Sequence, residues 1–186
     1  MDTPASLLER LRQPAQEQAW RRFVELYTPL LYGWARRRGC PDADAADLVQ
    51  EVFTLLVRKL PEFSYDRHKS FRGWLRVVAH NCWRILQRRA QLPRGAEVPD
   101  LADLPAPDEP EPFWETEYRE LLVGRALALM RADFEPETWQ ACWECVVASR
   151  PPAAVAKELG VSVGTVYAAK SRVLSRLRQE LAGLLD

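Results

Sequence analysis

Apolar side chains recur at intervals of three and four positions through most of this chain, and that spacing places them on one face of a helix. Three such runs cover 18–38, 42–60 and 71–90, and the second run stops at Pro61. Pro29 is expected to kink the first helix. The expected inward-facing residues are Trp20, Phe23, Val24, Tyr27, Leu30, Leu31 and Trp34, then Leu48, Val49, Val52, Phe53, Leu56 and Leu60, then Leu75, Val78, Ala79, Cys82, Ile85 and Leu86. No run of alternating β-branched residues indicates a strand, so the pattern predicts an all-α protein.

A proline-rich stretch divides these helical runs into two groups. Six prolines lie between Leu92 and Pro112, so this stretch is expected to be extended rather than helical. Beyond it the helical pattern resumes over 113–131 and 136–148, and two further helices close the chain. The sequence therefore predicts two small helical domains, 1–90 and 113–186, joined by an extended, acidic, proline-rich linker at 91–112.

The distribution of charge adds to this picture. The formal net charge is zero over 186 residues, but nine Lys and Arg stand against two Asp and Glu between Arg58 and Arg89. Between Glu97 and Glu120 nine acids stand against one Arg. Such segregation indicates separate partners or surfaces. Because no apolar run is long enough to span a membrane and no signal-peptide pattern is visible, we expect a cytoplasmic protein without a membrane partner.

The cysteines do not form the framework of a small secreted protein, so reduced thiols are expected. Cys142 and Cys145 form a C-x-x-C pair, which could indicate redox or metal chemistry. On a helix they would lie one turn apart beside Trp139 and Trp143, where packing explains them better. A structural zinc site needs four ligands, and both histidines lie far away in the sequence. We therefore expect no metal, no cofactor and no catalytic residues.

Residues 152–171 have the spacing of a helix-turn-helix, reading PAAVAKELGVSVGTVYAAKS. This motif needs a small residue where the helices cross, a glycine in the turn and apolar inner faces. Ala156, Gly160 and Val166 occupy those places, while Ser162 can cap the second helix. Further apolar contacts are expected from Val155, Leu159 and Val161. An ordinary helical hairpin could use the same apolar residues, but it would not require the glycine, the cap and a basic second helix together.

Basic residues recur every four positions along the third predicted helix, at Arg72, Arg76, His80, Arg84 and Arg88. Like charges at this spacing repel, so an external polyanion would offset the cost. Aromatic residues are interleaved with them, namely Phe63, Tyr65, Phe71, Trp74 and Trp83. Basic groups that track phosphates and rings that stack on bases are typical of single-strand binding. Each single ring taken alone is better explained by the core, but we expect at least one of the group to face nucleic acid.

The second predicted helix presents a different, acidic surface. Asp47, Glu51, Thr54 and Arg58 share one face opposite the apolar stripe, with Asp44 and Gln50 nearby. A solvated face and a docking site explain this pattern equally well.

Together these segments resemble the extracytoplasmic-function sigma factors, the smallest members of the sigma-70 family. The likeness extends from about Trp20 to Leu181, and it is carried by DLVQEVF at 47–53, SFRGWLRVVAHN at 70–81 and GVSVGTVYAAKSRV at 160–173. The resemblance implies a protein without enzymatic activity that directs RNA polymerase to promoters and initiates transcription. Its implied partners are core RNA polymerase, promoter DNA and either an anti-sigma factor or a kinase as regulator.

The resemblance also implies roles for particular residues. The DLVQEVF helix would dock on the beta-prime clamp helices through Asp44, Asp47, Gln50 and Glu51. The FRGWL segment and the helix after it would recognise and help melt the minus-ten element, through Phe71, Arg72, Trp74, Arg76, Asn81, Arg84 and Arg88. The helix-turn-helix domain, which would also meet the beta flap, would read the minus-thirty-five element with Ser162, Thr165, Tyr167, Ala168, Lys170, Arg172 and Arg176. The acidic linker would thread the RNA exit path.

Several positions depart from the family pattern. Ala46 replaces a glutamate in the acidic run before LVQEVF, which implies weaker or differently controlled polymerase binding. Tyr167, Ala168 and Ala169 replace the usual residues of the recognition helix, so base preference does not transfer from relatives. A ligand-sensing one-component regulator would also carry a helix-turn-helix, but it would not need the basic stripe or the acidic face.

Overall fold

The computed structural model describes residues 6–62, 70–91 and 111–185, and every regular element in these ranges is helical. The chain divides into two compact units. The first unit comprises Leu7–Leu122 and the C-terminal tail from Gly183, and the second unit is built from Val123–Ala182. The all-α prediction is confirmed. The loop with Phe63 and Tyr65 and most of the predicted linker, residues 92–110, lie outside the described ranges.

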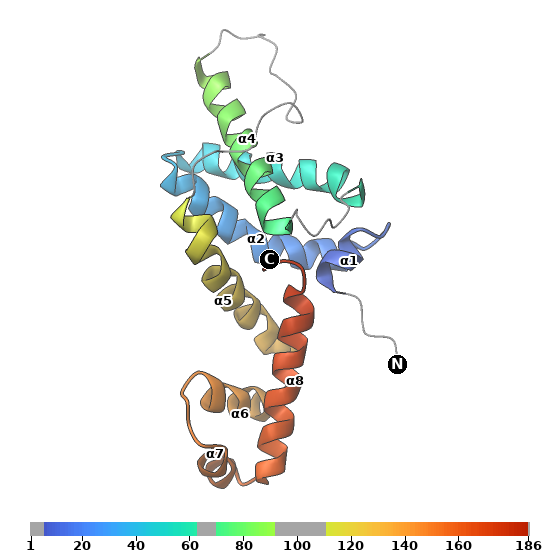
Figure 1. Ribbon diagram of the computed structural model, residues 1–186, viewed down its shortest axis with the longest axis vertical. Coiled ribbons are helices and arrows are strands. Elements are labelled where there is room, and N and C mark those ends of the chain that lie inside the picture. Colours follow the sequence, from blue (N-terminus) through green and yellow to red (C-terminus); the bar gives the residue numbers. More distant parts are fainter. Residues whose placement is uncertain (1–5, 63–69, 92–110, 186) are drawn as a thin grey trace. The chain divides into compact units, whose positions relative to one another are not determined.

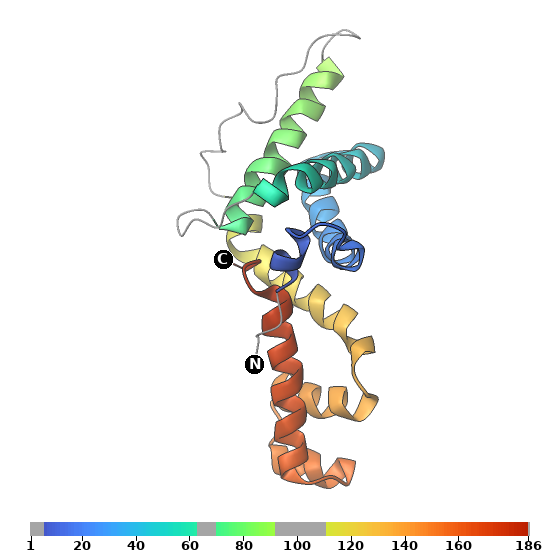
Figure 2. The ribbon, with the colours of Figure 1, turned by 90° about the vertical axis from the view of Figure 1, so that its right-hand side faces the viewer.

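The first unit is built around three long helices. They are α2 (Glu17–Arg37), α3 (Asp42–Lys59) and α4 (Phe71–Gln91), with a short 3₁₀ turn at Leu60–Glu62 after α3. Helix α3 packs on both α2 and α4, and α4 crosses α3 in two perpendicular views (Figures 1 and 2). These bounds agree with the predicted runs to within one or two residues. Helix α2 continues through Pro29.

Glycine sets the end of α2. Gly39 has a φ of +85°, a left-handed conformation that costs glycine little. The turn lets the Cys40 backbone N–H donate to the carbonyl of Ala35 at 3.1 Å, which closes the helix. The chain then reverses into α3 within a few residues.

The core of the first unit contains most of the residues predicted to face inward. Phe23, Tyr27, Trp34 and Leu56 are among its fully buried side chains. Val24 differs from the prediction, because its side chain is exposed. Trp20, Phe53, Val78 and Leu86 are half-buried rather than buried. A short helix that the pattern did not predict, α1 (Leu7–Leu11), buries three leucines and packs on α2.

The first residues after the linker, as far as Leu122, belong to the first unit. Phe113–Glu117 forms a π-helical turn, and α5 (Tyr118–Met130) follows it. Phe113, Trp114, Tyr118 and Leu122 are all buried. The division between units therefore falls between Leu122 and Val123, ten residues beyond the start of the predicted C-terminal domain.

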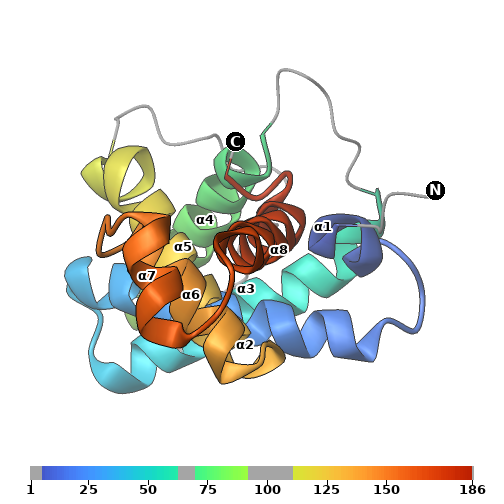
Figure 3. The same cartoon turned by 90° about the horizontal axis from the view of Figure 1, so that it is seen from below.

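The second unit holds the remaining helices. After a 3₁₀ turn at Arg131–Asp133 come α6 (Pro136–Val146), α7 (Pro152–Leu159) and α8 (Val163–Leu181). Helix α8 packs on α6 and α7, and α6 also contacts α7 (Figure 3). Their shared core consists of Ala141, Val155, Ala156, Val166 and Ala169. Small residues at these positions let the three helices approach closely.

None of the helices in the described ranges combines the length and apolar character needed to cross a membrane.

Candidate nucleic-acid interface

The turn between α7 and α8 has the geometry that a helix-turn-helix requires. Gly160 has a φ of +65° and ends α7 in the left-handed conformation. Ser162 begins α8, and its hydroxyl accepts a hydrogen bond from the Thr165 N–H at 3.0 Å. Ala156 and Val166 are buried where the helices meet. Val161 is less buried than the sequence suggested, because its side chain is exposed.

The outer face of α8 is accessible at its N-terminal end. Tyr167 is 57% exposed, and Ser162, Thr165, Ala168 and Arg172 are exposed as well. Lys170 is half-buried. Arg176 forms an ion pair with the buried carboxylate of Glu180 at 3.5 Å, so this guanidinium is partly engaged within its own helix. The first two turns of α8 thus present hydroxyl and phenol groups, and the cations follow them.

An arginine that the sequence analysis did not single out holds this motif in place. Arg150 binds the carboxylates of Glu144 at 3.0 Å and Glu158 at 2.5 Å, and so joins the end of α6 to α7. These two carboxylates raise the pKa of Arg150. Ser149 before it has a φ of +53°, a conformation that residues with a side chain rarely adopt. No periodic pattern in the sequence marks this contact.

In the first unit, α4 carries the basic stripe, but its members differ in accessibility. Arg88 is exposed, whereas Arg72, Arg76, His80 and Arg84 are half-buried. Arg72 donates from Nη1 to the carbonyl of Trp114 at 3.1 Å. The Arg76 side chain is only 18% exposed and lies 3.9 Å from the Glu115 carboxylate.

Two residues predicted to meet DNA lie in the core instead. Phe71 is fully buried, and its ring makes edge contacts with Phe23 and Tyr27 at 6.0 Å. Asn81 is 2% exposed. Both side chains are covered by protein in this structure, and their direct contact with DNA stays a prediction. Trp74, which is half-buried and lies 5.9 Å from the Phe71 ring, keeps part of its surface accessible.

The centre of the basic stripe is neutral at physiological pH. The pKa of His80 is lowered to about 4, first by burial and then by the positive charges of Arg38, Arg84 and Arg76 in that order. The imidazole lies 5.5 Å from the Trp83 ring, which also lies under the Arg38 guanidinium at 5.0 Å. The stripe therefore consists of four guanidinium groups with a neutral imidazole in the middle.

Helix α3 presents the predicted acidic face. Asp47, Gln50 and Glu51 are exposed, and Asp44 is half-buried near the start of the helix. Glu51 lies 3.4 Å from Arg89 of α4. The opposite side of α3 carries the buried residues Leu48, Val52 and Leu56.

Comparison with known proteins identifies the family. The model of sigma-70 region 2 matches residues 23–101. The RNA polymerase sigma factor NccH of Alcaligenes xylosoxydans xylosoxydans is 32% identical over 96% of this chain and 93% of its own length. The chain belongs to the extracytoplasmic-function sigma factors of the sigma-70 family. The sigma factor CnrH of Cupriavidus metallidurans is also 32% identical, over 91% of this chain and 88% of its own. SigE of Mycolicibacterium smegmatis is 26% identical over 97% of this chain and 68% of its own.

The match to region 2 falls on the helices that carry the acidic face and the basic stripe of this sigma factor. The sequence analysis missed a third charged feature of that unit, the arginines at the end of α2. Arg36 pairs with Asp42 at 3.0 Å, Arg37 pairs with Glu117, and Arg38 pairs with Glu111. The signal available was the run of three arginines at 36–38, together with the acids that follow the linker.

Cys142 and Cys145 lie on α6 as free thiols, Cys142 buried and Cys145 half-buried. Burial raises the pKa of Cys142, which keeps it protonated. In the described ranges, no three His, Cys, Asp or Glu side chains are grouped as a metal site would need.

Proposed function

We propose that this sigma factor directs RNA polymerase to promoters by binding two DNA elements, one with each unit. The observation that carries the proposal is the helix-turn-helix of the second unit, whose α8 begins with a capped, accessible turn. The N-terminal residues of such a helix meet base edges in the major groove. Tyr167 and Thr165 are the accessible polar groups there, and Arg172 lies one turn further on, where it can reach phosphate.

The first unit is proposed to hold the minus-ten element through α4. Arg84 and Arg88 of its second half, with Arg72, Arg76 and Trp74 of its first half, combine cations with an accessible ring. Opening a duplex removes bases from the stack at a cost of a few kcal/mol, which protein contacts must offset. The cations of this helix can contact phosphates, and its accessible ring can stack on an unpaired base.

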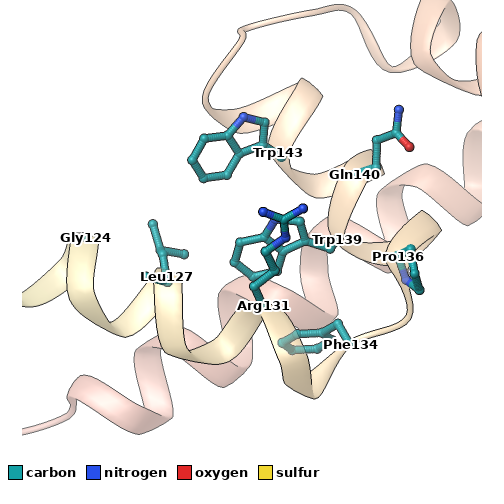
Figure 4. A pocket seen from close by; sticks show the side chains of 9 residues that line it. Gly124, Leu127, Arg131, Phe134, Pro136, Trp139, Gln140 and Trp143 are labelled. Atoms are coloured by element: carbon teal, nitrogen blue, oxygen red, sulfur yellow. The ribbon is translucent and has the colours of Figure 1, made fainter. Parts of the chain in front are cut away.

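Two further surfaces are proposed to bind the polymerase itself. The exposed acids of α3 would meet the beta-prime clamp helices. In the second unit, a groove of about 700 Å³ is lined by Leu127, Phe134, Trp139 and Trp143, with Arg131 at the same opening (Figure 4). The indoles of Trp139 and Trp143 are stacked with centroids 6.1 Å apart, and Trp143 is exposed. An exposed apolar groove of this kind suits the beta flap, because binding there would remove its rings from water.

The family resemblance further suggests a regulator, either an anti-sigma factor or a kinase. Ala46 stands at the exposed position of the acidic run where relatives carry a glutamate, so a phosphate added nearby could supply the missing charge. Polymerase binding before and after treatment with a cognate kinase tests this, and unchanged affinity would count against it.

Run-off transcription from genomic fragments, with purified core polymerase plus this chain, tests the main proposal. We expect discrete transcripts that depend on the chain, and their start sites would reveal the promoter sequence. Tyr167→Ala should reduce these transcripts, while Ser171→Ala, an exposed position on the same helix, should not. Failure to bind core polymerase in stoichiometric amount would contradict the proposal.

A further inference from the structure

A short acidic segment of this sigma factor lies against the cationic face of its first unit. We call residues Glu111–Glu117 the docked segment. Three of its acids pair with three different arginines: Glu111 with Arg38, Glu117 with Arg37, and Glu115 with Arg76 at 3.9 Å. The Glu111 carboxylate also accepts a hydrogen bond from the Trp34 indole at 2.9 Å. These pairs come from α2 and α4, so the segment bridges two helices.

Aromatic packing accompanies the ion pairs. The Trp114 ring is buried and meets the Trp34 ring edge-on, with centroids 5.9 Å apart. Phe113 lies under the Arg37 guanidinium at 5.6 Å. The docked segment therefore offers this face the same two chemical groups that single-stranded nucleic acid offers, negative charge and flat rings.

The segment occupies arginines that the proposed function assigns to DNA. Arg72 donates its hydrogen bond to the Trp114 carbonyl, and Arg76 has most of its surface covered beside Glu115. Both lie in the first half of α4, next to Trp74. A nucleic-acid strand along α4 could not use these two guanidinium groups while the segment is in place.

We infer that the docked segment is an internal competitor of nucleic acid on α4, and that DNA binding displaces it. This inference rests on the proposed role of α4 in binding the minus-ten element. In the free protein the segment occupies Arg72 through a backbone carbonyl and Arg76 through the Glu115 carboxylate. When it leaves, Arg72 and Arg76 become available together.

Local features make this contact reversible. The Glu115 side chain is 53% exposed, and the Arg37–Glu117 pair is exposed on both sides, so water screens these attractions. The Trp114 indole N–H is buried, and no acceptor for it is present among the described residues, which weakens the docking. Phe113–Glu117 forms a π-helical turn, a rare conformation that often marks functional sites.

The test uses the full chain and a labelled short single-stranded DNA of mixed sequence at low salt. The variant Glu115→Gln with Glu117→Gln removes two ion pairs while keeping side-chain size. We expect it to bind the DNA about five- to tenfold more tightly, the change expected when a competent state rises from about a tenth to most of the population. Fluorescence anisotropy measures the affinity.

A matched control separates this effect from a simple change in net charge. Glu17→Gln with Glu120→Gln removes two exposed acids of the same unit, and neither acid pairs with the arginines of α4. It should bind the DNA at most about twofold more tightly, since the remote charges are screened. An equal gain in both double variants would overturn the competition.

Hydrogen exchange gives an independent reading of the displacement. In the wild-type chain, amides of residues 113–117 should exchange faster once the DNA is bound, because the segment has left its site. Unchanged or slower exchange would contradict the inference while leaving DNA binding intact. If neither wild type nor variant binds the strand, the proposed role of α4 fails and the inference fails with it.

Discussion

The phenol of Tyr27 lies 2.8 Å from the phenol of Tyr118, ninety-one positions further along the chain, and both are fully buried. Tyr118 donates its own hydrogen to the carbonyl of Leu184 at 2.8 Å, so Tyr27 must be the donor within the pair. Burial raises the pKa of both phenols, which keeps them protonated. One hydrogen-bonded chain thus joins α2, the start of α5 and the C-terminal tail.

Tyr118→Phe should destabilise the first unit. The substitution keeps the ring but removes the donor to Leu184 and the acceptor for Tyr27, and it leaves both groups buried without this partner. We expect a loss of about 1–3 kcal/mol in the free energy of unfolding. Native-state hydrogen exchange of the α2 amides measures this unit separately from the second one.

Tyr32→Phe is the matched control for that substitution. Tyr32 donates to Asp42 at 2.9 Å, but this hydrogen bond lies at the surface, where water can replace the partner. Its loss should change stability by less than about 0.5 kcal/mol. Equal effects of the two substitutions would show that the buried chain of hydrogen bonds contributes nothing beyond a surface contact.

These contacts also show which features of the fold could not be predicted from the sequence. Periodicity located α2, α3 and α4 closely, because each has one continuous apolar face that a bundle must bury. It could not assign Trp114 and Tyr118 to a unit, since apolar spacing shows that a face is buried but not against what. The boundary at 122 depends on the Trp34 and Tyr27 contacts, which join residues far apart in the chain.

The candidate site was predictable to a similar extent. The turn glycine and cap of the helix-turn-helix were found because both are local requirements of backbone geometry. The burial of Phe71 and Asn81 was not predicted, because sequence spacing does not show which side of α4 the bundle covers. The five residues of α1 are too few for a helical period to be recognised.

Ser162→Ala should weaken the helix-turn-helix. It removes the hydroxyl that accepts the Thr165 N–H, and loss of such a cap costs about 1 kcal/mol. Ser171→Ala, in the interior of the same helix, should be neutral or slightly stabilising, because alanine favours helix. Hydrogen exchange of the α8 amides compares the two variants. A larger loss for Ser171→Ala would refute the assignment of Ser162 as the cap.

Stability should fall in mildly acidic solution because of His80. Its pKa is about 4 in the folded chain against 6.5 when unfolded, so between these values the unfolded state binds more protons. The neutral His80 side chain makes its full contribution to folding stability above about pH 6.5, and this contribution is lost as the pH falls toward 4. The dependence of stability on pH that His80 contributes stays below about 1.4 kcal/mol per pH unit, because one imidazole binds at most one proton.

Urea unfolding between about pH 7 and pH 5 checks this expectation against His80→Gln. Glutamine is similar in size and does not titrate, so its stability should depend less steeply on pH in this window. Carboxylates titrate in both chains, and the comparison removes their contribution. Parallel pH curves for wild type and variant would mean that neither burial nor the neighbouring arginines depress the pKa of this imidazole.

The acidic face of α3 can be tested apart from DNA binding. Asp47→Asn with Glu51→Gln removes two exposed charges from the surface proposed to meet the clamp helices. We expect about tenfold weaker binding to core polymerase, equivalent to about 1.4 kcal/mol, and a smaller difference at high salt where the charges are screened. Fluorescence anisotropy of labelled chain with purified core polymerase provides both affinities.

Glu17→Gln with Glu120→Gln serves again as the control, because it changes the net charge of the same unit by the same amount. If α3 is the docking surface, this control should bind polymerase like wild type. Equal weakening in both double variants would mean that polymerase senses only the overall charge of the unit. Wild-type affinity in the Asp47 and Glu51 variant would identify this face as a solvated one, the alternative that the sequence pattern left open.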